Sequence, residues 1–251
     1  MTDILPRTAF VVPCYNEADR LVTVDLINLA TAAHCTVVLV NDGSTDGTDQ
    51  LLAAVATDRT DIHVVSLPRN KGKGEAVRQG LLWATVAGYD IVGFCDADFA
   101  TPVSEVASLA HSCRERHVVV LGSRVALLGH RIERSLPRHY SGRVFGTLSS
   151  IVLGFQVYDT QCGAKVFRNT PELRASIAQP FSSKWAFDVE LLGRLAIEYR
   201  GTDGFKEVPL QEWHDVAGSK LSLRSSLRST ADLLRIRRAL RRARRARGND
   251  T

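Results

Sequence analysis

One stretch decides the fold of this chain: Ile91-Val92-Gly93-Phe94-Cys95-Asp96-Ala97-Asp98-Phe99-Ala100-Thr101-Pro102. The apolar run at its start predicts a buried parallel strand. The run ends in two carboxylates, Asp96 and Asp98, and Thr101-Pro102 has the cap and first-position proline that open a helix. The two carboxylates therefore fall at the carboxyl end of a strand, where open α/β sheets bind ligands.

Two carboxylates this close together suit a divalent cation. Mg²⁺ and Mn²⁺ prefer hard oxygen ligands, and Mg²⁺ usually takes one or two protein carboxylates together with substrate phosphates. An Asp-x-Asp pair is also common in solvated turns, because aspartate is a frequent turn former. The pair by itself leaves both interpretations open, and the rest of the sequence decides between them.

Strands and helices alternate on both sides of this stretch. Short apolar runs predict further strands at residues 9–13, 36–40, 62–67 and 117–121. Helical patterns begin at Glu17, Asp49 and Pro102, and this alternation predicts a doubly wound, mostly parallel sheet flanked by helices. The polar loops that follow four strands would then converge on one edge of the sheet: residues 13–17, 41–48, 96–101 and 122–124.

A further helix is predicted after the segment Asn70-Lys71-Gly72-Lys73-Gly74. Its glycines would let the backbone approach a ligand closely, and a helix N terminus favours anions. Its two lysines add charge suited to a diphosphate, although the spacing is not that of a Walker A loop. A surface turn with solvated lysines is the alternative.

The second half of the chain is less regular. The arginine-rich residues 125–141 predict a mobile loop, and helices are predicted over 143–153 and 185–199. A short strand at Val166-Phe167 and an edge strand over 205–213 would complete the sheet. The side chains of Trp83, Phe94 and Trp185 are expected in the core, and His214 is expected to be structural.

Composition indicates a globular body with a basic tail. The 251 residues are 45% hydrophobic and 24% charged, which is ordinary for a globular protein. Residues 224–247 carry ten arginines against one aspartate, so the formal charge of +5 leaves −4 for the remainder. A mildly acidic body argues against a general nucleic-acid binder. We expect a catalytic domain over 1–222 and a basic amphipathic helical tail over 223–251.

The sequence also predicts where the protein works. Five cysteines outside any C-x-x-C spacing are typical of free thiols in the cytoplasm. No signal-peptide pattern follows Met1, and no run reaches the roughly 18 apolar residues of a membrane span. A basic helix over 223–247 is predicted to lie on an anionic membrane, at its cytoplasmic face, because arginines cover much of it and its apolar side consists of Leu223, Leu227, Leu234, Ile236 and Leu240. The alternative is that the side with Leu233, Leu234 and Ile236 docks on the domain.

The ordered motifs resemble a known family. Val12-Pro13-Cys14-Tyr15-Asn16-Glu17, residues 41–48, residues 70–74 and Asp96-Ala97-Asp98 follow one another as in the inverting glycosyltransferases of family 2, which have the GT-A fold. Later segments are similar to dolichyl-phosphate glucosyltransferases and their bacterial polyprenyl-phosphate relatives: residues 159–165, residues 185–192, and Trp213 with Gly218-Ser219-Lys220. The resemblance covers about residues 8–238.

The resemblance implies roles for individual residues. A nucleotide pocket would be lined by Pro13, Tyr15, Glu17 and Asp42, with Lys73 near it. Asp96 and Asp98 would hold the ribose of a nucleotide-sugar donor and an Mg²⁺ or Mn²⁺ ion on its diphosphate. Asp159 would lie near the reacting sugar. The acceptor phosphate would meet Arg124 and the arginines of residues 131–143, Arg131 and Arg143 among them.

The implied reaction transfers a hexose, with UDP-glucose favoured as donor, to a polyprenyl or dolichyl phosphate. Ala100 stands where mannose synthases often carry glutamine, which disfavours the alternative of a GDP-mannose donor. An anionic phosphate acceptor needs no strong base, whereas a hydroxyl acceptor would need a carboxylate, Asp159 first and Asp188 second. A nucleotide-sugar binding protein without turnover is another alternative. A nucleotidyltransferase would need a glycine-rich loop after the first strand, and residues 13–17 do not form one.

Overall fold

The computed structural model describes residues 6–115, 117–215 and 223–248. The first half of the chain alternates strands and helices as predicted: β1 (Thr8–Cys14), α1 (Thr23–Ala32), β2 (Thr36–Asn41), α2 (Thr48–Ala56), β3 (Ile62–Ser66), α3 (Lys73–Val86), β4 (Ile91–Phe94) and α4 (Val103–Glu115). The second half is built from nine further elements: β5 (Val119–Ser123), β6 (Arg131–Ile132), α5 (Leu136–Leu153), β7 (Lys165–Arg168), α6 (Pro171–Ala178), α7 (Phe187–Glu198), β8 (Phe205–Pro209), β9 (Glu212–Trp213) and α8 (Leu223–Gly248).

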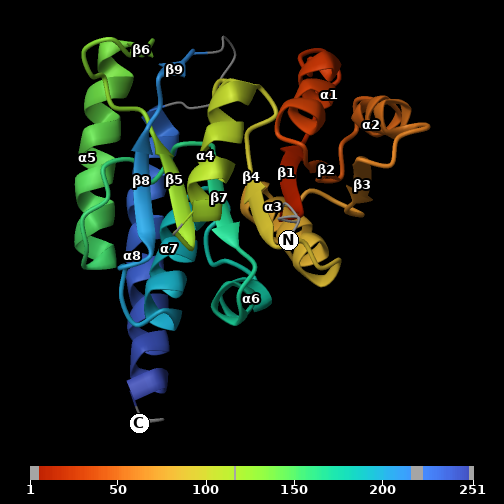
Figure 1. The fold of residues 1–251 in the computed structure, drawn as a ribbon. Coiled ribbons are helices and arrows are strands. Elements are labelled where there is room, and N and C mark those ends of the chain that lie inside the picture. The colour runs from red at the N-terminus through yellow and green to blue at the C-terminus, as the bar shows by residue number, and fades with distance from the viewer. Residues whose placement is uncertain (1–5, 116, 216–222, 249–251) are drawn as a thin grey trace.

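One mixed sheet organises the described chain, with strand order β3-β2-β1-β4-β7-β5-β8 (Figure 1). Neighbouring strands are parallel except for β7, which runs antiparallel to both β4 and β5. The predicted mostly parallel sheet is therefore confirmed, with one antiparallel strand that the sequence did not predict. The direction of winding reverses between β1 and β4, and the carboxyl ends of strands at such a point are where α/β sheets bind ligands.

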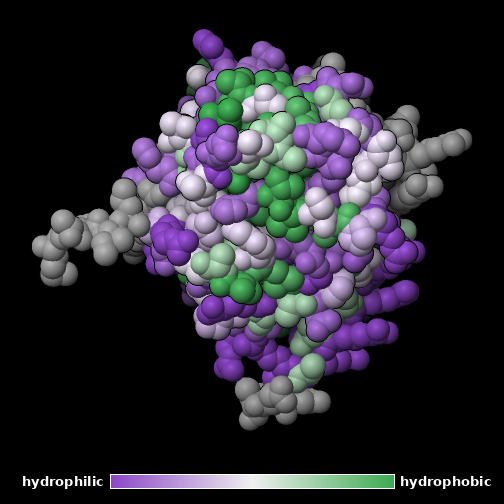
Figure 2. All heavy atoms as spheres, turned by 90° about the vertical axis from the view of Figure 1, so that its right-hand side faces the viewer, coloured by the Kyte–Doolittle hydropathy of each residue, from purple (hydrophilic) through white to green (hydrophobic). Residues whose placement is uncertain are grey.

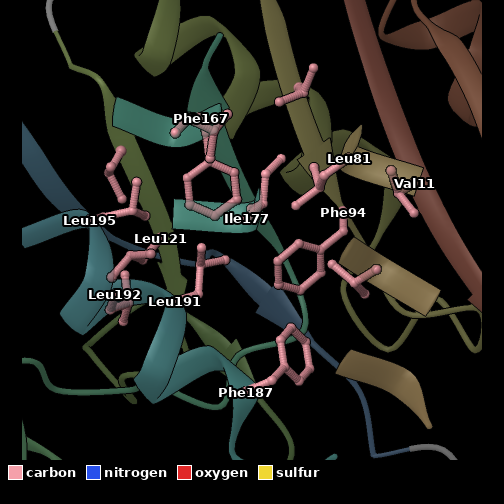
Figure 3. Packing of buried hydrophobic residues seen from close by; sticks show 14 of the residues in the cluster. Val11, Leu81, Phe94, Leu121, Phe167, Ile177, Phe187, Leu191, Leu192 and Leu195 are labelled. Atoms are coloured by element: carbon pink, nitrogen blue, oxygen red, sulfur yellow. The ribbon is translucent and has the colours of Figure 1, made fainter. Parts of the chain in front are cut away.

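The central strands are buried on both faces, as the helices on either side require. On one face, Phe94 of β4 lies between Phe167 and Phe187, with ring centroids 6.3 Å and 5.7 Å away (Figure 3). On the other face, Phe10 packs with Leu26 of α1 and Leu109 of α4. These two layers hold the strand ends, and the loops after them, in fixed positions.

Several elements differ from the sequence prediction. The edge strand predicted over 205–213 is divided into β8, which pairs with β5, and β9, which pairs with β6. The helical pattern at Glu17 forms only a turn, in which the Glu17 carbonyl accepts from the amides of Arg20 and Leu21, and α1 begins at Thr23. The loop predicted over 125–141 is shorter, because β6 and the start of α5 lie within it. The helix α6 was not predicted, although Thr170 caps it and Pro171 opens it.

α8 docks on the body of the molecule and extends below the other elements in Figure 1. Leu233, Ile236 and Leu240 are buried against the core, whereas Leu234 is exposed. Gly193 of α7 permits the close approach, since a Cβ there would lie 2.4 Å from Leu240. The expectation that Ile236 and Leu240 face lipid is therefore wrong. The docking alternative holds for Leu233 and Ile236 but not for Leu234, which is exposed.

Arginines fasten the lower end of α8. The Arg244 guanidinium donates to the Leu153 carbonyl at the end of α5 over 2.6 Å, and Arg247 forms an ion pair with Glu198 of α7. The division of the chain at residue 222 stays a prediction.

Three further expectations concern membranes, thiols and the last motif. The described helices include none that is both long and apolar enough to cross a bilayer. The five cysteines are buried free thiols, as predicted. The motif at 218–220 lies outside the described residues, as do the side chains of Leu223 and Leu227.

Candidate active site

The turn after β1 and the loop after β2 are tied together at the carboxyl edge of the sheet. The Asn16 amide donates to Ser44 Oγ over 3.1 Å, and the Thr45 amide donates to Asn16 Oδ1 over 2.9 Å. Asn16 has a φ of 51°, a left-handed conformation that asparagine tolerates well. Pro13 and Tyr15 are half-buried beside this junction, where a nucleotide pocket was predicted.

Asp42 anchors the lysine–glycine loop. It is almost fully buried, and its two oxygens accept from the amides of Lys71 and Gly72, each over 2.8 Å. Lys73 follows directly and opens α3. Asp42, which the family resemblance assigns to a nucleotide pocket, therefore also fixes the loop that presents Lys73.

Asp96 and Asp98 lie just past the end of β4 among cationic groups. Lys73 Nζ is 2.5 Å from Asp96 Oδ1. Arg20, which the sequence analysis did not single out, is held by buried Glu17, with 2.6 Å between Arg20 Nη2 and Glu17 Oε1. The pKa of Arg20 is raised by its bond to Glu17 and then by the charges of Asp98 and Asp96. Glu17 thus acts through Arg20 on the carboxylate pair.

The charges at this edge perturb one another. Burial, and then the charge of Asp96, raise the pKa of the Asp98 carboxyl. Burial alone would lower the pKa of Lys73, but nearby carboxylates, Asp96 foremost, raise it above its ordinary value. The two aspartates therefore crowd negative charge that the neighbouring cations only partly balance.

These residues fit a divalent cation. A cation between Asp96 and Asp98 would relieve the repulsion that, after burial, raises the pKa of Asp98. Within the described residues there is no cluster of three or more His, Cys, Asp or Glu side chains able to hold a metal. The protein would thus supply the two carboxylates and a bound diphosphate would supply further oxygens, as is usual for Mg²⁺.

The segment before β7 is shaped around Asp96. A Cβ at Gly163 would lie 2.2 Å from Asp96 Oδ2, so only glycine fits there without movement. Two residues on, fully buried Lys165 donates to Asp188 Oδ1 and to the Cys162 carbonyl, each over 2.6 Å. Burial raises the pKa of Asp188 despite this lysine. Asp188 is therefore the partner of a buried cation, a contact that the sequence analysis missed.

Arg124 and Asp159 form a bidentate ion pair on the other side of β4. Arg124 Nε and Nη2 lie 2.6 Å and 2.8 Å from the two Asp159 oxygens. Glu207 of β8 holds the same loop by accepting from the amides of Tyr158 and Asp159. Burial alone would raise the pKa of Asp159, but the charge of Arg124 holds it well below its usual range.

A second arginine crowds this pair. Burial, and then the charge of Arg124, lower the pKa of Arg134. Arg143 lies over the Tyr158 ring, with Cζ 3.8 Å from its centroid, and its side chain is exposed. Arg131 is exposed on β6. Among the described arginines predicted to meet an acceptor phosphate, Arg134 is the one whose pKa is lowered by the charge of Arg124, whereas Arg131 and Arg143 are exposed.

Two aromatic expectations have opposite outcomes. Phe94 lies in the core as predicted, whereas Trp185 is 54% exposed, so its placement in the core was wrong. At this turn the Ser183 hydroxyl accepts from the backbone amides of Trp185 and Ala186. His214 pairs with Glu133 and Glu212 at 3.3 Å and 3.0 Å, which supports its structural assignment.

Comparison with known proteins decides the family. The profile of glycosyl transferase family 2 matches residues 9–172. A dolichyl-phosphate beta-glucosyltransferase of Saccharomyces cerevisiae is 32% identical over 91% of this chain and 73% of its own length. One of Trichomonas vaginalis is 30% identical over 91% of this chain and 70% of its own length. The chain belongs to glycosyl transferase family 2.

This glycosyltransferase, of the hexosyltransferase type, has the predicted GT-A fold. Its structure is similar to the glucosyl-3-phosphoglycerate synthase of Mycobacterium tuberculosis solved with Mn²⁺, UDP and glucosyl-3-phosphoglycerate, with a TM-score of 0.65. That similarity covers 92% of this chain and 80% of the other, at 21% identity. The mannosyl-3-phosphoglycerate synthase of Rubrobacter xylanophilus matches with a TM-score of 0.67 at 22% identity, over 96% of this chain and 75% of the other. At this identity the likeness establishes the fold alone.

Proposed function

We propose that this glycosyltransferase moves glucose from UDP-glucose to a polyprenyl or dolichyl phosphate. The curated relatives named above act on dolichyl phosphate and transfer glucose. The chain matches them over most of its length, including the segments around Asp96 and Asp159. GDP-mannose remains the alternative donor, and Ala100 disfavours it.

The observation that carries the proposal is the state of the two carboxylates offered as bases. Asp159 is bound at both oxygens by Arg124, and Asp188 is bound by Lys165. A carboxylate whose pKa is held low by an arginine is a poor proton acceptor. A hydroxyl acceptor would need such a base, whereas a phosphate oxygen is already anionic. The arrangement therefore favours a phosphate acceptor.

Arg124 and Arg134 have the chemistry to bind that phosphate. Burial, and then the charge of Arg124, lower the pKa of Arg134, and an anion between the two guanidinium groups would relieve the second of these effects. Planar guanidinium groups bind phosphate oxygens in a bidentate manner. Asp159 would then position Arg124, so that the role of Asp159 beside the acceptor is a supporting one.

On the donor side, Asp96 and Asp98 would hold the metal, and Lys73 and Arg20 would face the diphosphate. The metal, when bound, supplies positive charge that stabilises the departing diphosphate. Lys73 would exchange its contact with Asp96 for a phosphate oxygen. Pro13, Tyr15, Glu17 and Asp42 would form the wall around the nucleotide.

We also propose that α8 attracts the enzyme to an anionic membrane by charge alone. Its apolar side is occupied by the domain, but Arg241, Arg242 and Arg245 remain exposed. Each arginine near an anionic surface contributes about 1 kcal/mol, within a Debye length. Replacing all three by glutamine should weaken sedimentation with phosphatidylglycerol vesicles and remove most of its salt dependence. Binding that is unchanged and indifferent to salt would refute this role.

A donor screen tests the proposed function. Thermal shifts with UDP-glucose, UDP and GDP-mannose, each with Mn²⁺, should show stabilisation by the uridine compounds. Mass spectrometry should then detect glucosyl phosphate formed on a short-chain polyprenyl phosphate. Stabilisation by GDP-mannose alone would mean that GDP-mannose is the donor. Donor binding without any transfer would favour a nucleotide-sugar binding protein.

A further inference from the structure

α5 carries an apolar stripe on its outer side. Tyr140, Val144 and Ile151 are 66%, 61% and 63% exposed. Their spacing of four and seven residues places them in one line along the helix, with exposed Thr147 between them. The adjoining, inward side of α5 packs on the core through Phe145, Leu148, Val152 and Leu153. The helix is therefore apolar on two sides, and one of them faces outward.

The loop between β5 and β6 adds to this surface. Leu128 is fully exposed and Leu127 about half exposed. Both follow Arg124 by three and four residues, at the carboxyl edge of the sheet. Figure 1 shows the loop and β6 beside the N-terminal end of α5. We call the stripe on α5 together with Leu127 and Leu128 the α5 face.

Arginines border the α5 face, and acidic residues are absent from α5 itself. Arg131 in β6 and Arg143 near the middle of α5 are exposed. α8 lies alongside the lower end, where Arg244 reaches the Leu153 carbonyl, and adds the exposed Arg241 and Arg245. An apolar surface with a basic border is complementary to a bilayer with anionic headgroups.

The inner side of the same helix lies against Arg134, one of the two arginines of the candidate acceptor site. A Cβ at Gly142 would lie 2.6 Å from Arg134 Nη2, and one at Gly146 would lie 2.8 Å from the Tyr158 carbonyl. A helix with its side chains is roughly 10–12 Å thick. The α5 face is therefore separated from Arg134 by about the thickness of one helix.

We propose that the α5 face is the surface on which the enzyme rests on a bilayer containing anionic phospholipid. Resting there would hold Arg124 and Arg134 at the level of the headgroups. This inference rests on the proposed function, because a lipid-phosphate acceptor displays its phosphate at that level. A second copy of the chain is a poorer occupant, since a two-fold contact through this face would bring the two sets of arginines together.

Vesicle sedimentation tests this surface. The variants Val144→Ser/Ile151→Ser and Leu127→Ser/Leu128→Ser remove apolar groups from it. The matched control is Val24→Ser/Val86→Ser, at valines 54% and 85% exposed on α1 and α3. Figure 2 shows the side of the molecule that α1, α2 and α3 form, where apolar patches are interrupted by hydrophilic side chains. Binding of each protein is measured on vesicles of phosphatidylcholine with and without phosphatidylglycerol. Only variants whose melting temperature matches that of the wild type are compared.

The proposal predicts that each α5-face variant binds mixed vesicles about tenfold more weakly and that the control stays within about twofold. Glucose transfer to a water-soluble short-chain polyprenyl phosphate should be unchanged, while transfer to a long-chain acceptor in vesicles falls. Equal vesicle binding by wild type and α5-face variants would overturn the proposal. So would a wild-type dimer in sedimentation velocity that these variants convert to monomer with vesicle binding intact. If vesicle binding depends on the α5 face but glucose is transferred to no phosphate acceptor, the proposed function alone would be overturned.

Discussion

The position of Asp98 suits metal binding and does not stabilise the folded protein. Burial and the neighbouring Asp96 raise its pKa, so the ionised side chain does not stabilise the folded state. We expect Asp98→Ala to reduce glucose transfer about a hundredfold or more while the melting temperature stays within about 2 °C. Transfer assays with added Mn²⁺ or Mg²⁺, beside thermal melts, check this. Undiminished transfer would show that Asp98 does not hold the metal.

Arg124 should separate acceptor binding from donor binding. It lies after β5, across the sheet edge from Lys73 and the donor loops. We expect Arg124→Ala to raise KM for the phosphate acceptor at least about tenfold, with the Kd for UDP-glucose within about twofold. Arg131→Ala, at an exposed arginine, is the matched control. Loss of donor affinity with acceptor use retained would mean that the two sites are exchanged.

The Arg124–Asp159 pair should reveal itself in the pH dependence of stability. Asp159→Asn leaves a buried guanidinium without its anion, which costs about 3–5 kcal/mol. Because the folded pKa of Asp159 lies below its unfolded value of about 3.9, the stabilisation is fully present above roughly pH 4 and is lost as the pH falls through the folded pKa.

The difference in unfolding free energy between wild type and Asp159→Asn should therefore stay constant from about pH 8 to pH 5 and narrow only in stronger acid. Denaturant titrations across that range measure it. A difference that closes between pH 7 and pH 5 would indicate a carboxylate free to titrate, as a general base does.

At the scale of elements, α8 is part of the folded body. Leu240 is buried against Gly193, whereas Leu234 on the same helix is 54% exposed. We expect Leu240→Ala to lower the free energy of unfolding by about 2–5 kcal/mol and Leu234→Ala to change it by less than about 1 kcal/mol. Chemical denaturation gives both values. Equal, small effects would mean that α8 is not docked in solution.

Docking also changes how the helix should be probed. A chain ending near Ser222 would expose the apolar surface that Leu233, Ile236 and Leu240 cover, so its membrane binding would reflect that new surface. Substituting the exposed arginines keeps the packing and removes only charge. This makes charge substitutions the sharper experiment for α8.

Sequence reasoning succeeded for this molecule where the signal is local. Each strand end, from Pro13 to Ser123, is marked by an apolar run that stops at polar residues, and parallel strands bring those ends to one edge. The carboxylate pair and the loop before Lys73 were found in this way. The capping signal at Thr170-Pro171 was equally local, and it was overlooked.

What sequence could not supply depends on partners far apart in the chain. Arg124 meets Asp159 across 35 residues, and Lys165 meets Asp188 across 23. The antiparallel course of β7 depends on its two neighbours, and the docking of α8 depends on one glycine in α7. Without those partners, Asp159 and Asp188 look like available bases, whereas the folded molecule has each of them bound to a cation.

The whole account depends on the acceptor being a phosphate, and one measurement addresses that directly. Purified enzyme is given UDP-glucose, Mn²⁺ and either a short-chain polyprenyl phosphate or the matching polyprenol, and kcat/KM is determined for each. We predict glucose transfer to the phosphate at least about a hundredfold faster than to the alcohol, since Arg124 holds the pKa of Asp159 low and Asp188 is bound to the buried Lys165, which leaves neither well suited to deprotonate a hydroxyl. Transfer to the alcohol at an equal or greater rate would contradict the account.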